Sequence, residues 1–204
     1  LVSRTVAMSN KYFGGVLENA GAKEDVDDDL IATVTGAYEK VRAKINEFKI
    51  SDALSEIFVI FKRANKYIDE TMPWALAKDE SKTARLKTVL YNLAESIVIG
   101  TSLLEPFMPD TAAKVTSYFG TTVRDYGRIV RFGGIENGTK VVENPEILFR
   151  RLDVKEVVDK AHEMYEARKK PAAPEVKEEE KPEIDIDYFA GLDLSCLLYT
   201  SDAA

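Results

Sequence analysis

Apolar residues recur at every third or fourth position along most of the first 120 residues, and this spacing constrains the fold more than any other feature. One stripe comprises Leu30, Ile31, Val34, Tyr38, Val41, Ile45 and Phe48, and a second comprises Leu54, Ile57, Phe58, Phe61, Ala64 and Ile68. Such stripes are typical of amphipathic helices that bury one face. The sequence therefore predicts an all-α protein built as a bundle of about five helices.

Caps, glycines and prolines set the expected helix boundaries. A pair of glycines stops the first helix, an acidic cluster at 27–29 suits the start of the second, and Pro73 disfavours helix in the residue before it. Prolines in the stretch LLEPFMPD separate the last two helices. We expect helices that end at Gly14, span 27–48, end near Glu70, span 81–103 and span 110–120.

Beyond Gly120 the helical period is lost, and glycines and turn dipeptides predict irregular chain with a short hairpin at Asn137–Gly138. A further helix follows and completes a domain over 1–169, with His162 expected on its surface. Residues 170–183 are rich in proline and glutamate, a composition typical of a linker. Residues 184–194, which contain IDIDYFAGLDL, have the alternation of a strand followed by a helix cap. Residues 195–204 resemble a translated sequencing adapter, and we treat them as an artefact.

Acidic residues in the tail account for the whole net charge of −7. From Pro171 onward there are nine acidic and two basic residues, which leaves 26 of each sign in residues 1–170. A neutral body permits local basic patches, and these matter more for a phosphate contact than the total charge does.

Several classes of function have few candidate residues. A single cysteine rules out an internal disulfide framework, and a single histidine disfavours a His-rich metal site or a serine-type triad. No apolar run reaches the roughly 18 residues of a membrane span, so we expect a cytoplasmic location and no membrane contact. We therefore expect the chain to act by binding rather than by catalysis.

The stretch YIDETMPWALAKDE contains the only tryptophan, Trp74, directly after a proline at a helix end. Basic residues flank it at Lys62, Arg63, Lys66, Lys78, Lys82, Arg85 and Lys87. An aromatic plane beside cations is typical of single-stranded RNA recognition. A tryptophan here can also pack between helices, so the local pattern leaves both interpretations open.

Several motifs in fixed order carry a family resemblance: LVSRTVAMSNKYFGG, FKRANKYIDETMPWALAKDE, LLEPFMPDTAAKVTSYFG and ILFRRLD. Together they resemble the C-terminal anticodon-binding domain of bacterial methionyl-tRNA synthetase, a class I aminoacyl-tRNA synthetase. IDIDYFAGLDL resembles the opening of the tRNA-binding OB-fold module that many of these enzymes append. The resemblance covers residues 1–194, and Arg150 departs from it because a proline is common there.

The resemblance implies roles for individual residues. In this family an Asn and an Arg spaced as N-x-x-x-R, together with the Trp of a PW pair, read the anticodon CAU. Arg4 matches the Arg, and Pro73 and Trp74 match the pair, while the Asn would fall just before Leu1. Asn65 and Asp69 match positions that hold the anticodon surface and help to reject wrong anticodons.

The resemblance also implies a longer parent enzyme that joins methionine to its tRNA with ATP and magnesium in a catalytic domain outside this chain. Its partners would be tRNA, that catalytic domain in cis and a second subunit bound through the OB-fold module. We expect no cofactor and no catalysis in this chain itself.

Two other hypotheses remain at this stage. The bundle can come from a related synthetase for isoleucine, valine, leucine or cysteine, which would keep the helices without the paired Arg and Trp. It can also be a helical interaction module that binds no RNA, in which case Trp74 would be buried. The exposure of Trp74 and its distance from Arg4 distinguish these hypotheses.

Overall fold

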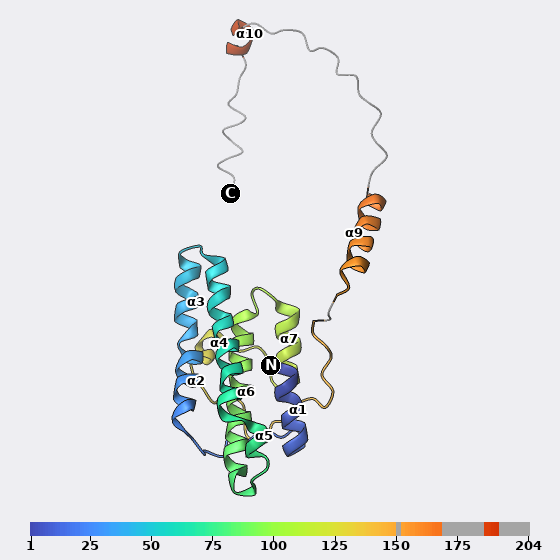
Figure 1. Ribbon diagram of the computed structural model, residues 1–204. Helices are drawn as coiled ribbons and strands as arrows, with labels where there is room; N and C mark the ends of the chain where they lie inside the picture. Colours follow the sequence, from blue (N-terminus) through green and yellow to red (C-terminus); the bar gives the residue numbers. More distant parts are fainter. Residues whose placement is uncertain (150–151, 169–185, 192–204) are drawn as a thin grey trace. The chain divides into compact units, whose positions relative to one another are not determined.

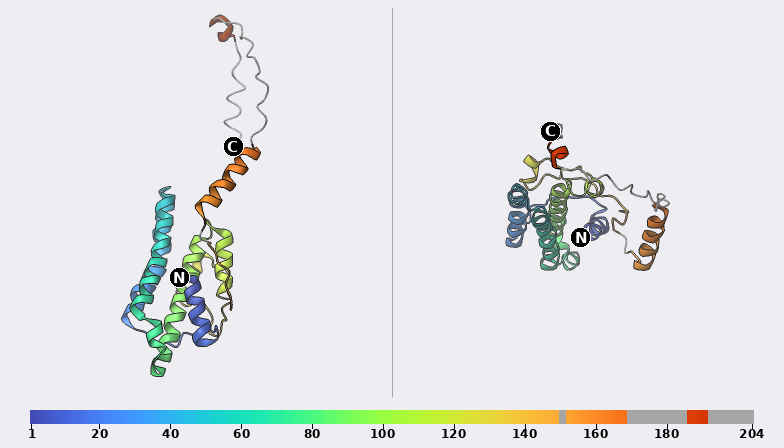
Figure 2. Two further views of the ribbon diagram at one scale, coloured as in Figure 1. Left: turned by 45° about the vertical axis from the view of Figure 1, so that its right-hand side comes forward. Right: turned by 90° about the horizontal axis from the view of Figure 1, so that it is seen from above.

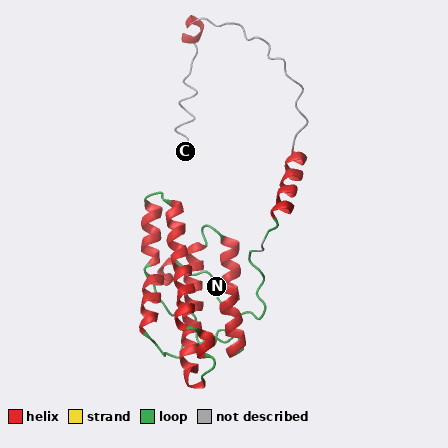
Figure 3. Ribbon diagram, viewed as in Figure 1, coloured by secondary structure: helices red, strands yellow, loops and turns green. Residues whose placement is uncertain are grey.

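The computed structural model describes residues 1–149, 152–168 and 186–191. The chain divides into two compact units, Leu1–Arg150 and Arg151–Ala204. Within the described residues the regular secondary structure is helical, and Figure 3 shows helices joined by loops. The all-α prediction is confirmed.

The first unit is a helical bundle (Figure 1). Two views show α4 and α6 lying between the α2–α3 pair on one side and α1 and α7 on the other (Figure 2). The elements are α1 (Val2–Phe13), α2 (Asp25–Thr35), α3 (Ala37–Asn46), α4 (Ile50–Thr71), α5 (Pro73–Leu76), a 3₁₀ turn η1 (Glu80–Lys82), α6 (Thr83–Leu104), α7 (Pro109–Tyr118) and α8 (Tyr126–Ile129).

Helix α6 is the centre of the bundle, and every residue from Thr88 to Leu104 is buried. A helix that is covered all round needs apolar or well-paired side chains on every face. Its apolar residues belong to two clusters. Leu90 and Leu93 pack with α2, α3 and α4, whereas Ile97 and Val98 pack toward α1, α7 and the chain after Phe119.

The second predicted helix is two helices in the structure, because the chain turns at Gly36 between α2 and α3. Helix α2 also begins earlier than predicted. Glu24 is its N-cap residue and forms a reciprocal capping box with Asp27, so the acidic cluster lies inside the first turn. The helix therefore begins two residues before the expected start at 27–29.

The segment after Gly120 pairs with the chain that directly follows α1, at Gly15–Leu17, rather than with itself. The Leu17 amide donates to the Thr139 carbonyl at 2.9 Å, and the Val141 amide donates to the Gly15 carbonyl at 2.9 Å. Val16 and Lys140 form an isolated antiparallel bridge. The predicted short hairpin is wrong, because the chain after the turn at Asn137 finds its partner more than a hundred residues away.

The second unit contains α9 (Val154–Arg168), which confirms the predicted further helix and carries His162 on its exposed surface. Ile186–Ala190 form the short helix α10, so the strand expected at the start of 184–194 is wrong for these residues. The linker 170–183 and the adapter-like 195–204 lie outside the described residues. The OB-fold assignment stays a prediction.

Two buried carboxylates join the helices of the bundle. On α2, Asp27 is fully buried and receives hydrogen bonds from Arg85 at 2.6 and 2.8 Å and from the Tyr67 hydroxyl at 2.6 Å. Asn92 donates to the same hydroxyl at 3.2 Å. This network links α2, α4 and α6 through groups that would each be costly to bury alone.

The second buried carboxylate is Glu95 on α6. Arg124 donates to it from two guanidinium nitrogens at 2.5 and 2.9 Å. The backbone amides of Gly133, Gly134 and Ile135 donate to it at 2.9, 2.8 and 3.1 Å. Five donors on one carboxylate fix the irregular chain after α7 against the central helix.

Substitution of Glu95 tests the contribution of this carboxylate. We expect Glu95→Gln to lower the free energy of unfolding by about 3 kcal/mol or more, because it leaves the Arg124 guanidinium buried without a counter-charge. Urea unfolding followed by circular dichroism measures the change. The matched control is Glu39→Gln, an exposed partner of Arg42, for which we expect less than about 1 kcal/mol. Equal effects of the two substitutions would contradict this role for Glu95.

The titration of the buried Asp27 carboxyl group makes the stability of the bundle depend on pH. Burial raises the pKa of this carboxyl, but hydrogen bonds from Arg85 and Tyr67 outweigh burial and leave the pKa below its usual value. A carboxyl whose pKa is lowered on folding contributes stability above its unfolded pKa of about 4, and that contribution is lost as the pH falls through the folded pKa.

We therefore expect Asp27→Asn to be less stable than the wild type at pH 7, with a smaller further loss of stability between pH 5 and 2. Thermal unfolding at pH 7 and between pH 5 and 2 measures both effects. Asp28→Asn, an exposed change on the same helix, is the control and should keep the acid-dependent loss of the wild type. If Asp27→Asn lost as much stability between pH 5 and 2 as the wild type does, Asp27 would not be the source of the acid-dependent loss.

Candidate nucleic-acid interface

A sharp turn at the end of α4 sets the position of Trp74. Met72 follows α4 in the left-handed region, with φ of 43°, which is uncommon for a residue with a side chain. Pro73 then begins α5, where its missing amide costs nothing. Pro73 is buried, and the next side chain, that of Trp74, is 45% exposed. The turn therefore presents the indole at the surface.

Trp74 lines a cavity of about 350 Å³ together with one face of α1. The α1 residues are Arg4, Ala7, Met8, Lys11 and Tyr12. Arg4 is exposed, and the Lys11 ammonium lies 5.4 Å from the centre of the Tyr12 ring. We call this the Trp74 cavity. It brings together an aromatic plane from α5 and two cations from α1, which lie 63 and 70 positions before Trp74 in the sequence.

Asn65 and Asp69 lie one turn apart on the exposed face of α4. The Asn65 side-chain amide donates to the Phe61 carbonyl at 3.0 Å, which turns its nitrogen toward the helix backbone. Neither residue lines the Trp74 cavity. The structure therefore brings Arg4 and Trp74 together, and it places Asn65 and Asp69 on the helix that leads to them.

Most of the basic residues predicted to flank Trp74 already have acidic partners. Arg63 is mostly buried and pairs with Asp29 and Glu70, and the buried Arg85 pairs with Asp27. Lys66, Lys82 and Lys87 form further ion pairs. The predicted basic flank is therefore largely neutralised by the protein itself. Within the described part of the chain, Lys62 and Lys78 have no ion pair.

The sequence analysis did not predict Lys11 and Tyr12 as residues of this site, although both lie in the motif LVSRTVAMSNKYFGG. Arg4 and Lys11 are seven positions apart, close to two helical turns, so they lie on one face. That spacing was the signal that could have identified Lys11.

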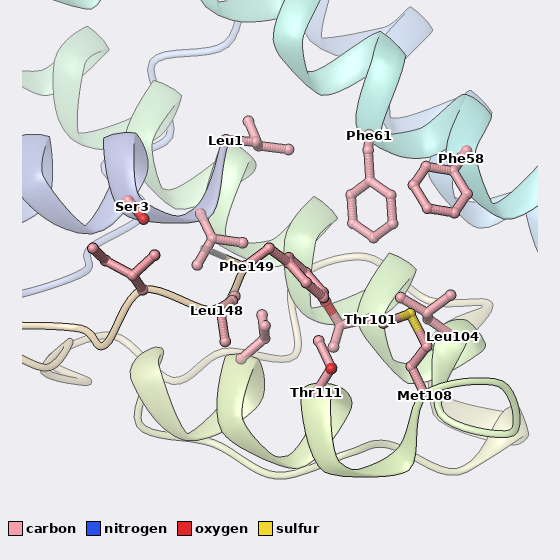
Figure 4. Close-up of a pocket in the computed structure, with 13 residues that line it drawn as sticks. Leu1, Ser3, Phe58, Phe61, Thr101, Leu104, Met108, Thr111, Leu148 and Phe149 are labelled. Carbon is pink, nitrogen blue, oxygen red and sulfur yellow. The ribbon is translucent and has the colours of Figure 1, made fainter. Parts of the chain in front are cut away.

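A second cavity, of about 420 Å³, is apolar (Figure 4). The aromatic rings of Phe58, Phe61 and Phe149 lie along it, with Leu104 and Met108 beside them. It offers no charged side chain for a phosphate.

Among the described residues no three His, Cys, Asp or Glu side chains gather as a metal site would require. No helix among the residues that the structure describes is long and apolar enough to cross a membrane.

Comparison with known proteins gives consistent matches. The family described as "Anticodon binding domain of methionyl tRNA ligase" matches residues 17–170. The chain is 43% identical over 195 residues to the methionine–tRNA ligase of Clostridium perfringens and 44% identical over 195 residues to that of Caldanaerobacter subterraneus subsp. tengcongensis. Each match covers 95% of this chain and 30% of the relative, so the chain spans less than a third of these proteins.

Solved structures give the same likeness. The free Mycobacterium tuberculosis methionyl-tRNA synthetase superposes with a TM-score of 0.69 and 29% identity, over 74% of this chain and 31% of that protein. The same enzyme bound by methionyl-adenylate superposes with a TM-score of 0.65 and 30% identity, over 70% and 29% of the two chains.

Intrinsic fluorescence reports directly on the Trp74 cavity, because Trp74 is the only tryptophan. We expect emission typical of an indole in contact with water and strong quenching by acrylamide. Arg4 and Lys11 attract anions, so iodide should quench more strongly than caesium. In the control variant Arg4→Gln/Lys11→Gln the preference for iodide should fall. Emission typical of a buried indole, with little quenching, would show that Trp74 is a core residue.

Proposed function

Because this chain belongs to the anticodon-binding domains of methionyl-tRNA ligases, we propose that it recognises the CAU anticodon of methionine tRNA through the Trp74 cavity. The single observation that supports this site best is the shared cavity of Arg4 and Trp74. A non-RNA module would bury its tryptophan, whereas Trp74 is 45% exposed. The family match favours methionyl-tRNA ligase over the related synthetases.

The roles follow from the chemistry of the two side chains. The indole of Trp74 offers a flat face on which an unstacked anticodon base can lie, an interaction worth roughly 1 to 3 kcal/mol. The Arg4 guanidinium presents two parallel donors, which suit a base edge or a phosphate. Stacking tolerates any base, so Arg4 supplies the directional part of recognition.

Three further residues support the site. Pro73 is buried, begins α5 and thereby fixes the direction of the indole. Asn65 and Asp69 lie on the exposed face of α4 that precedes the turn. There the Asp69 carboxylate repels a phosphate that arrives in the wrong register, which disfavours incorrect anticodons.

The parent protein is proposed to be the ligase itself. Its catalytic domain, attached in cis and outside this chain, would join methionine to tRNA with ATP and magnesium in the cytoplasm. The solved relative bound by methionyl-adenylate supports the use of ATP there. An appended OB-fold module beginning in 184–194 would allow a homodimer.

Titration with an RNA stem-loop that carries the CAU anticodon tests the proposal. We expect Trp74→Ala to weaken binding by roughly 5- to 150-fold, because one base loses its stacking surface. Fluorescence anisotropy of a labelled stem-loop measures the affinity without relying on the tryptophan.

Tyr126→Ala is the matched control, since Tyr126 is a similarly exposed aromatic residue on α8, outside the Trp74 cavity. It should bind the stem-loop as the wild type does. The wild type should also bind a stem-loop with a scrambled anticodon more weakly. Equal binding by wild type and Trp74→Ala, or equal binding of the two stem-loops, would refute the proposal.

A further inference from the structure

A second concave site with positive charge lies around α8. Arg124, Arg128 and Arg131 line a cavity of about 270 Å³ together with Phe132 and the glycines of 127–134. We call it the arginine pocket. It shares no lining residue with the Trp74 cavity. We propose that the arginine pocket binds a phosphate group.

The charge of the pocket comes from two of its three arginines. Arg124 is buried and neutralised by Glu95, so it forms part of the wall. Arg128 and Arg131 are exposed, and neither has an ion pair among the described residues. Asp125 is the neighbouring carboxylate, and it accepts the Arg128 amide at 3.1 Å as the cap of α8. Two guanidinium groups against one carboxylate leave the mouth of the pocket positive.

The wall of the pocket is held in place before any ligand arrives. Glu95 fixes the amides of Gly133 and Gly134 as well as the Arg124 side chain. A Cβ atom on Gly134 would lie 2.8 Å from the Arg124 guanidinium, so a side chain at this position would displace Arg124 from its place on Glu95. Gly133 has φ of 95°, which side chains rarely adopt. A prearranged wall lowers the ordering cost of binding.

The side chains at the mouth suit an oxyanion with several oxygens. A guanidinium group pairs with two phosphate oxygens at once, and Arg128 and Arg131 can approach one phosphate from two directions. Phe132 is half-buried and contributes an apolar side to the pocket. The phosphate can belong to a free phosphate compound or to an RNA backbone, and both sources offer the same group to the arginines.

Titration with inorganic pyrophosphate tests the site directly. We expect saturable shifts of the amide resonances of Gly127, Gly133 and Gly134 in nuclear magnetic resonance spectra. Arg128→Gln/Arg131→Gln should weaken this binding at least about tenfold, because it removes two charge-assisted contacts. Both residues are exposed, so the variant should keep its helical circular dichroism. Arg42→Gln, which removes an exposed arginine paired with Glu39, is the control and should bind as the wild type does.

Binding of whole methionine tRNA, compared with the isolated stem-loop, identifies the source of the phosphate. If it is the RNA backbone, the double variant binds whole tRNA at least about tenfold more weakly, with a salt dependence reduced by about one to two counter-ions. If it is a free compound, only pyrophosphate binding is lost. Equal binding by wild type and double variant in both titrations would overturn the proposal. The pyrophosphate titration is independent of the anticodon, so failure of the Trp74→Ala test would leave it unaffected.

Discussion

The Glu95 carboxylate, buried in the middle of α6, is the constraint on which the arrangement of the bundle depends. An ionised carboxylate without partners could not remain in that position. It remains there because Arg124 and three backbone amides donate five hydrogen bonds to it. Those donors come from chain that has no regular structure of its own, so this chain is ordered by Glu95. Asp27 has the same function on the other side of α6, where Arg85 and Tyr67 are its donors.

The network of Asp27, Arg85 and Tyr67 fixes the position of the proposed interface. Tyr67 lies on the last two turns of α4 and is bound to Asp27, so the end of α4 is fixed in the core. The Thr71 hydroxyl donates to the Tyr67 carbonyl at 2.7 Å at the last residue of the helix. The left-handed Met72 and the buried Pro73 follow immediately. An exposed indole is thus placed by buried groups, which is what a precise stacking surface requires.

The sequence predicted what depends on local pattern. Helical periodicity identified α1, α4, α6 and α7, and the family motifs named Arg4 and Trp74 as partners before any contact was known. It did not predict that Asp27 and Glu95 are buried, because their partners lie 58 and 29 positions away. The same limit explains the error about the basic flank of Trp74. A count of lysines and arginines does not reveal which of them are already paired with carboxylates. Arg63 and Arg85 are paired in this way.

That pairing changes how an RNA surface here would work. Recruiting Arg85 to a phosphate would break a buried ion pair at a cost of about 3 to 5 kcal/mol, more than one surface phosphate contact returns. If the proposed interface binds RNA, the attraction to its phosphates would come chiefly from Arg4 and Lys11, which have no ion pair among the described residues. A weakly charged surface gains little from phosphates of arbitrary sequence, because non-specific binding is largely electrostatic. Under the proposed function, affinity there would depend instead on stacking and on directed hydrogen bonds, which an anticodon can satisfy and a duplex backbone cannot.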